Sequence, residues 1–299
     1  MVPILADWRS AWTVVDTPFH ASSNVSYELL CPQGSSAYSV LKAQDGRGYV
    51  LRVEGLGDCL ISPSNFRIQA DWLDTHPSVL ESQVWPRVFG QVHSPVLHSG
   101  AVEIGGLAAI FVGRSGHGKS TLCSAFYRDG YTLLNDDTLA FVEQSGKVGI
   151  YPVTRTLKLN DDSVDAVFGN AVPRTHQSGL RKTSIALGTV AGDNDEPTQP
   201  GAFFFINPVA PRALPELKPL KPTAACMRLL EQRFLFEAEE EDVARRDFGV
   251  LSRVATQTPA FELDVPRDFN RLGEVQTLVK CAMQDAAQQM AESSGKIRA

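Results

Sequence analysis

The chain has 299 residues, of which 43% are hydrophobic and 21% charged, and its formal net charge at pH 7 is −6. A chain of this size can bury a substantial core, so composition predicts a globular protein of one large or two modest domains that needs no disulfide framework. The negative charge argues against a nonspecific nucleic-acid binder. The N-terminus lacks the basic segment of a signal peptide, and no apolar run approaches about 20 residues, so we expect a cytoplasmic protein without a membrane partner.

Residues 1–93 are predicted to form a small β-rich unit. Runs of β-branched and aromatic residues alternate with Gly and Asp turn residues. The predicted strands are 27–31, 38–41, 49–53, 58–61 and 66–69. Apolar residues at helical spacing follow over 79–92, where Pro86 should kink or shorten the helix.

Residues 94–299 are predicted to form the catalytic domain. Two apolar runs, 96–102 and 107–112, flank Gly105 and Gly106 and indicate two strands joined by a tight turn. A glycine-rich loop follows the second run. Beyond the loop we expect a helix over 120–127 and strands over 131–134 and 138–142.

The remainder of the chain alternates extended and helical patterns. We expect extended chain over 148–159, strands over 183–190 and 202–206, and an exposed loop over 191–201. A Pro-rich connector over 208–222 leads to helices near 224–234 and 239–254. A closing helix should bury one face, formed by Phe269, Leu272, Val275, Leu278, Val279 and Met283.

The segment from Gly113 to Ser120, Gly-Arg-Ser-Gly-His-Gly-Lys-Ser, matches the P-loop pattern and lies between a predicted strand and a predicted helix. Glycines let the backbone wrap phosphates, and amides at a helix start bind them. Lys119 would contact the β- and γ-phosphates of ATP, facing solvent until then, and the Ser120 hydroxyl would bind Mg²⁺. The alternative is a glycine-rich turn with an exposed lysine. The predicted nucleotide-binding residues in the loop are Gly113, Arg114, Ser115, Gly116, His117, Gly118, Lys119, Ser120 and Thr121.

Three residues outside the loop are further candidates. Asp136 and Asp137 follow a predicted strand soon after the loop helix, where two carboxylates could serve as general base and metal ligand. An isolated Asn-Asp-Asp is commonly a solvated turn, but its position directly downstream of a P-loop pattern favours the functional role. His98 lies just ahead of the P-loop strand, and a packed or surface histidine is its plain alternative.

Arg155 is the last candidate for phosphate binding. It shares one face of a predicted strand with Leu157 and Leu159, and an arginine among inward apolar neighbours needs an anionic partner. Nucleotide phosphate would serve as that partner. A structural ion pair would serve equally well.

The segment 97–106, the loop through Ser120, and Gly130 to Asp137 together resemble the C-terminal catalytic domain of the HPr kinase/phosphorylase family, whose fold is related to phosphoenolpyruvate carboxykinase. The resemblance implies ATP-dependent phosphorylation of a serine hydroxyl. By position it implies His98 beside the transferred phosphate, Asp136 as base and Asp137 as metal ligand. After Leu159 the chain departs from that family, because the glycine-rich Glu-Ile-Arg-Gly segment has no counterpart. It is more similar to divergent HPr-kinase-like proteins of modified-peptide pathways, including kinases of lasso-peptide precursors.

The motifs predict a mixed α/β protein with a P-loop kinase core and a β-rich N-terminal unit that uses ATP and Mg²⁺. The resemblance implies that it phosphorylates a peptide or small protein bearing a serine. A kinase for a small hydroxyl metabolite and a nucleotide-binding regulator are the alternatives. The chain contains neither an Asn-Lys-x-Asp guanine motif nor a Leu-Ser-Gly-Gly-Gln transporter signature. Homo-oligomer formation is left open.

Overall fold

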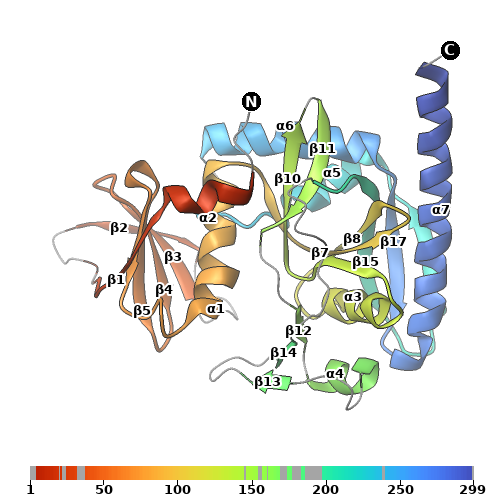
Figure 1. Cartoon of the computed structure of the whole chain (residues 1–299), viewed down its shortest axis with the longest axis horizontal. Helices are drawn as coiled ribbons and strands as arrows, with labels where there is room; N and C mark the ends of the chain where they lie inside the picture. Colours follow the sequence, from red (N-terminus) through yellow and green to blue (C-terminus); the bar gives the residue numbers. More distant parts are fainter. Residues whose placement is uncertain are drawn as a thin grey trace. The chain divides into compact units, whose positions relative to one another are not determined.

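The computed structural model describes residues 5–19, 21, 25–31, 38–144, 146–153, 157–159, 161–168, 174–176, 183–185, 197–237 and 240–297. The chain divides into two compact units. The N-terminal unit comprises Met1–His93 and a returning segment, Phe234–Val243, and the C-terminal unit comprises Ser94–Arg233 and Ala244–Ala299 (Figure 1). The expected secondary structure is mixed α/β, and both units contain a β-sheet.

The N-terminal unit is built on a six-stranded sheet with the order β1-β6-β5-β4-β3-β2. Its neighbouring strands are antiparallel, apart from the parallel pair β1 and β6. The five strands predicted here are confirmed within a residue or two at each end. The elements are η1 (Leu5–Ala11), β1 (Thr13–Asp16), β2 (Tyr27–Cys31), β3 (Tyr38–Ala43), β4 (Gly48–Val53), β5 (Gly57–Ser62), η2 (Pro63–Asn65) and β6 (Arg67–Ala70).

Pro86 does not break the helical segment after this sheet. Helices α1 (Pro77–Val79) and α2 (Trp85–Val92) are joined by a π-helical turn, η3 (Leu80–Val84). Proline has no amide hydrogen and its ring crowds the carbonyl four residues earlier. A π-turn just before Pro86 changes that bonding pattern, so the helix continues through the proline.

A segment from the C-terminal half of the chain completes the N-terminal unit, and we call Phe234–Val243 the strap. Phe236 of the strap is buried, and its ring stacks on Tyr49 with centroids 4.9 Å apart. Glu237 accepts a hydrogen bond from the Lys42 ammonium at 2.7 Å. The strap was not anticipated, because its acidic residues fit the pattern of a charged helix face.

The C-terminal unit contains a mixed sheet with the order β11-β10-β7-β8-β15-β17-β16, and β9 also pairs with β7. Strands β8, β15 and β17 are parallel, and the outer neighbours are antiparallel. The strands are β7 (Val96–Ile104), β8 (Leu107–Val112), β9 (Thr132–Asn135), β10 (Thr138–Gln144), β11 (Lys147–Pro152), β15 (Pro200–Val209), β16 (Glu216–Pro219) and β17 (Ala260–Pro266).

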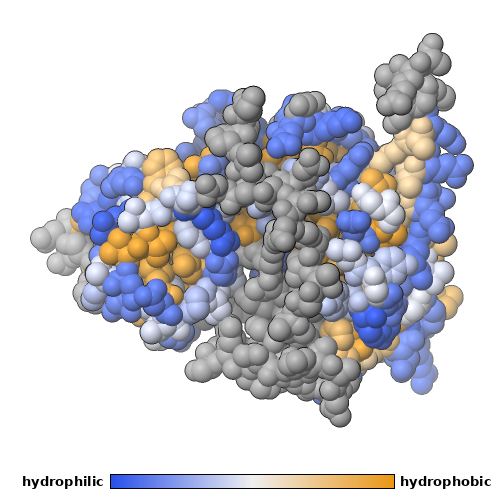
Figure 2. Space-filling view, in the orientation of Figure 1, coloured by the Kyte–Doolittle hydropathy of each residue, from blue (hydrophilic) through white to orange (hydrophobic). Residues whose placement is uncertain are grey.

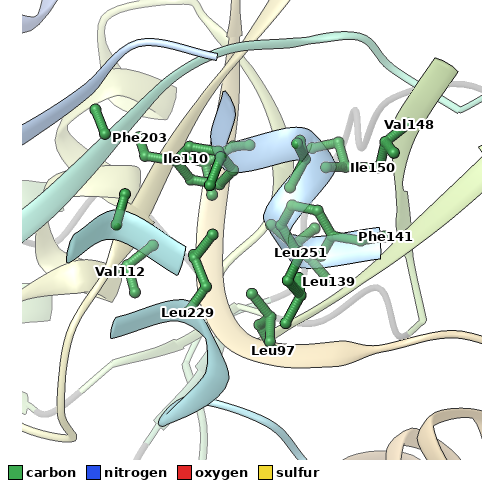
Figure 3. Close-up of a cluster of buried hydrophobic side chains, with 14 of the residues drawn as sticks. Leu97, Ile110, Val112, Leu139, Phe141, Val148, Ile150, Phe203, Leu229 and Leu251 are labelled. Atoms are coloured by element: carbon green, nitrogen blue, oxygen red, sulfur yellow. The ribbon is translucent and has the colours of Figure 1, made fainter. Parts of the chain in front are cut away.

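Alternate residues of this sheet pack under two layers of helices. Phe204 and its same-face neighbours pack against α3 (Lys119–Arg128) and α7 (Leu272–Ile297). Phe203 and Phe205 point to the opposite face, which α5 (Pro222–Leu230) and α6 (Glu241–Gln257) cover. Figure 3 shows this second cluster, in which Leu229 and Leu251 meet Leu97, Ile110 and Phe141. The sheet is therefore buried on both faces, and the outer sides of α6 and α7 are mainly hydrophilic (Figure 2).

Several expectations for this unit need correction. Strands β16 and β17 form where a connector and an interhelical linker were expected, and Pro200 and Gly201 are buried in β15 instead of lying in a loop. Phe269 is 42% exposed and belongs to a short 3-10 helix, η4 (Phe269–Arg271), so it is not on the buried face of α7. Helix α7 continues to Ile297.

Smaller elements lie between β11 and β15. Strands β12 (Leu157–Leu159), β13 (Arg174–His176) and β14 (Thr183–Ile185) form a separate antiparallel sheet, and α4 (Asp161–Phe168) was not predicted. No helix in the described part of the chain combines the length and apolarity needed to cross a membrane.

Candidate active site

The glycine-rich loop leaves the carboxyl end of β8 and ends at the first residue of α3. Gly116 and Gly118 adopt φ angles of 80° and 98°, in the left-handed region that favours glycine. Gly118 is the N-cap of α3, so the amides that begin this helix face the loop. The local geometry is therefore that of an anion-binding helix start.

Lys119 does not face solvent as the sequence suggested. Its side chain is only 5% exposed, and its ammonium donates to the carbonyl oxygens of Gly113 at 2.6 Å and Arg114 at 3.3 Å. A buried ammonium needs such acceptors, and the curled loop supplies them. The lysine charge is thus held inside the loop.

The loop is also tied to neighbouring elements. The Nδ1 atom of His117 lies 3.3 Å from the carbonyl oxygen of Ile206 in β15. The hydroxyl groups of Thr121 and Ser163 are 3.1 Å apart, which connects α3 to the first turn of α4. These contacts fix the loop between β15 and α4.

The two aspartates lie in a turn between β9 and β10 that Asn135 organises. The Asn135 Oδ1 atom accepts from the backbone amides of Asp136 at 2.6 Å and Asp137 at 3.1 Å, while its Nδ2 donates to the carbonyl oxygen of Thr138. The same Asx geometry occurs in ordinary turns. Here, however, the side chains differ, because Asp136 is only 1% exposed while the side chain of Asp137 is 21% exposed.

Strand pairing brings His98 to this turn. His98 lies opposite Thr138 in the register of β7 and β10, and its Nδ1 atom is 3.0 Å from Oδ1 of Asp137. Nδ1 has no aligned hydrogen bond among the described residues, so this contact is electrostatic and becomes an ion pair when the imidazole is protonated. His98 and Asp137 therefore form one polar group, although they are distant in the sequence.

A cavity of about 540 Å³ opens over the loop, a size typical of small-molecule sites. The loop residues from Ser115 to Thr121 form one wall and His98 another. The remaining lining residues come from α4, β15 and the end of β17, and they are Asp162, Ser163, Pro208, Val265, Pro266, Arg267, Asp268, Phe269 and Leu272.

Most of the predicted site is brought together here. The cavity lining does not include Gly113, Arg114, Asp136 or Asp137. Asp137 nevertheless contacts His98, which is a lining residue. Asp136 and Lys119 both act electrostatically on Cys123, whose pKa is raised well above its usual value mainly by burial. Arg155 lies outside the described residues. The wall from β17 and η4 was missed, although the alternating Phe261-Glu-Leu-Asp-Val265 could have indicated that strand.

Gly100 controls how closely β7 approaches the aspartate turn. A Cβ atom at this position would lie 2.7 Å from Sγ of Cys123 and 3.3 Å from both the Asn135 carbonyl oxygen and the Asp136 Cα atom. We expect Gly100→Ala to lower the free energy of unfolding by about 1–3 kcal/mol, the usual cost of overpacking, in urea denaturation.

Gly249→Ala is the matched control for that variant. Gly249 lies in α6 and nothing stands within 4 Å of a Cβ placed there. Alanine should stabilise this helix interior by roughly 0.5–1 kcal/mol. If both alanine variants are equally stable, Gly100 is not a packing constraint on the turn.

Comparisons with known proteins add little to this geometry. No protein-family model matches the chain. No curated protein matches it either. The matching solved structures include the Hpr(Ser) kinase/phosphatase from Coxiella burnetii, which is 12% identical, with a TM-score of 0.32, over 66% of this chain and 98% of that one. A similarity this distant decides neither fold nor activity, so the function is inferred from the site.

Proposed function

We propose that this chain is an ATP- and Mg²⁺-dependent kinase that transfers the γ-phosphate to a serine hydroxyl of a peptide or small protein, with lasso-type precursor peptides as candidate acceptors. The observation that carries the proposal is one cavity lined by both the glycine-rich loop, which has the P-loop sequence pattern, and His98, the partner of Asp137. A loop alone would suit any nucleotide binder. A carboxylate and an imidazole beside it add the means to handle a hydroxyl proton.

The residues present fit a magnesium nucleotide. The amides at the start of α3, the Lys119 ammonium and the Ser120 hydroxyl all belong to the wall that would meet the phosphates. No group of three or more His, Cys, Asp or Glu residues in the described ranges forms a metal cage. Mg²⁺ commonly binds through phosphates, water and only one or two protein oxygens, so Ser120 and one aspartate would suffice.

Burial favours exchanging the roles that the resemblance implied for the two aspartates. Asp137 is partly exposed and contacts His98, which lines the cavity, whereas Asp136 is buried. We therefore assign Asp137 as the base that takes the acceptor's hydroxyl proton, with His98 orienting it. The serine oxygen then bonds to the γ-phosphorus as the bond to the β,γ-bridging oxygen breaks. Asp136 is left as the carboxylate on the metal side.

Transfer of label from γ-labelled ATP tests the proposal directly. The purified chain is offered serine-containing peptides, alanine-substituted versions of the same peptides, and free hydroxy amino acids. Serine-dependent labelling of peptides supports the proposal. Labelling of free amino acids alone would favour a small-metabolite kinase, and nucleotide binding without any transfer would favour a regulator.

The metal role of Ser120 gives a separate prediction. Ser120→Ala removes one oxygen ligand, and if that ligand contributes about 1.5 kcal/mol the Mg²⁺ concentration for half-maximal transfer should rise roughly tenfold. The measurement is a Mg²⁺ titration of the transfer rate at saturating ATP. Ser252→Ala, a serine whose hydroxyl bonds within α6, is the control and should leave the titration unchanged. An unaltered Mg²⁺ requirement in Ser120→Ala would remove Ser120 from the metal site.

A further inference from the structure

One end of the cavity is mainly apolar, although Arg267 and Asp268 also line it, and it carries an exposed aromatic ring. Pro208 from β15 and Val265 and Pro266 from β17 line it, together with Phe269 and Leu272. Phe269 is 42% exposed and lines the cavity, so its ring is accessible to a ligand bound there. Neither the P-loop nor the His98–Asp137 pair uses this surface.

The backbone holds this end of the cavity in a fixed form. The Arg267 amide donates to the carbonyl oxygen of Val209, which joins the segment after β17 to the end of β15. The Asp268 side chain accepts from the amide of Asn270 and caps η4, the short helix that begins with Phe269. The aromatic ring is therefore carried on an ordered turn.

The order of strands sets the direction in which a nucleotide would lie. Along the sheet, β10 and β7 bring Asp137 and His98 to one side of the P-loop strand β8, and β15 and β17 follow on the other side. If the transferred phosphate faces His98, a nucleotide that extends along the sheet away from His98 lies over β15 and β17. That direction leads to Phe269.

We propose that this apolar end is a nucleobase subsite in which the Phe269 ring stacks on a purine base. The inference rests on the proposed nucleotide-dependent function and adds the residue that selects a nucleoside triphosphate over a bare polyphosphate. Arg267 lines the same end, and it has no ion-pair partner among the described residues. A donor-only guanidinium beside an apolar surface suits an aromatic ligand that carries acceptor atoms, as purines do.

The test compares a ligand that has a base with one that has none. Calorimetry of the intact chain in Mg²⁺ measures the affinities of ATP and inorganic tripolyphosphate. Base–aromatic stacking by alanine substitution corresponds to about a 5- to 150-fold change in affinity. Phe269→Ala should therefore weaken ATP by that factor and leave tripolyphosphate unchanged, while Phe269→Trp, which keeps a stacking face, should retain ATP affinity.

Phe248→Ala is the matched control, because Phe248 is an exposed phenylalanine on α6 and does not line the cavity. It should alter neither affinity. Unchanged ATP affinity in Phe269→Ala, or equal loss of ATP and tripolyphosphate, would overturn the base subsite. Wild-type protein that binds tripolyphosphate as tightly as ATP would overturn it too, yet would leave the P-loop assignment intact. Failure of the wild type to bind either ligand would refute the P-loop assignment itself.

Discussion

Replacing Asp137 by asparagine is expected to lower the rate of phosphoryl transfer by about two to four orders of magnitude while Mg·ATP binding persists. A positioned general base contributes a factor of this size, and an amide cannot accept the hydroxyl proton. Asparagine has nearly the same shape as aspartate, and the side chain of Asp137 is 21% exposed. The substitution should therefore leave the surrounding structure intact. Single-turnover transfer and calorimetric binding of Mg·ATP, measured on the same preparation, separate chemistry from binding.

Asp136→Asn is the informative partner of that variant. We expect it to weaken Mg²⁺ and ATP together, because a neutral amide is a poor magnesium ligand. Asp285→Asn, an exposed position on α7, should change neither quantity. If Asp136→Asn instead abolishes transfer with binding intact, and Asp137→Asn weakens binding, the roles are those that the sequence resemblance implied. If neither substitution affects transfer, the aspartate turn is structural and the kinase proposal fails.

Replacing Lys119 by methionine should reduce transfer by about 10²- to 10³-fold, the usual effect of deleting one preorganised charge donor from the transition state. Methionine is preferred to alanine because the lysine stem is buried, and an unbranched side chain keeps that packing. Nucleotide affinity should fall as well, since the ammonium lies in the loop that would hold the phosphates. Transfer assays with calorimetry measure both effects.

Thermal unfolding tests whether the loss of activity in Lys119→Met is caused by unfolding of the protein. The ammonium donates to two loop carbonyls, so Lys119→Met could loosen the loop without unfolding the domain. Lys221→Met, at an exposed lysine that precedes α5, provides the control for loss of a surface charge. Activity within a few-fold of wild type in a folded Lys119→Met variant would be incompatible with a phosphate-binding P-loop.

Local sequence patterns were enough for the loop and its immediate setting. The hairpin through Gly105 and Gly106 forms as predicted, and both glycines adopt the positive φ angles that a two-residue turn requires. The strand, loop and helix around residues 113–120 follow one another directly in the chain. Their backbone conformation therefore depends on the residue types at a few neighbouring positions, which a local sequence pattern can report. The same is true of the five strands of the N-terminal sheet, whose turn residues mark their ends.

Long-range pairing decided what the sequence left open. The sequence indicates a single buried run at 203–205. In the structure, Phe204 packs in one hydrophobic core and Phe203 and Phe205 pack in the other, because helices cover both faces of the sheet. The strap escaped prediction because the partners of Phe236 and Glu237, namely Tyr49 and Lys42, belong to a distant part of the chain. The spacing of apolar residues along the sequence gives no information about such a contact.

The sequence by itself determined that a segment with the P-loop pattern, an aspartate pair and an upstream histidine are present, because each is a short local pattern. Only the tertiary structure decided which of them lie together and which are buried. Adjacent residues Asp136 and Asp137 look equivalent in the sequence, yet one is buried and the other meets His98. The segment after β17 likewise brings Phe269, in η4, to the cavity from the far end of the chain. Burial and strand register are properties of the packed sheet, and they depend on partners that lie tens to hundreds of residues away.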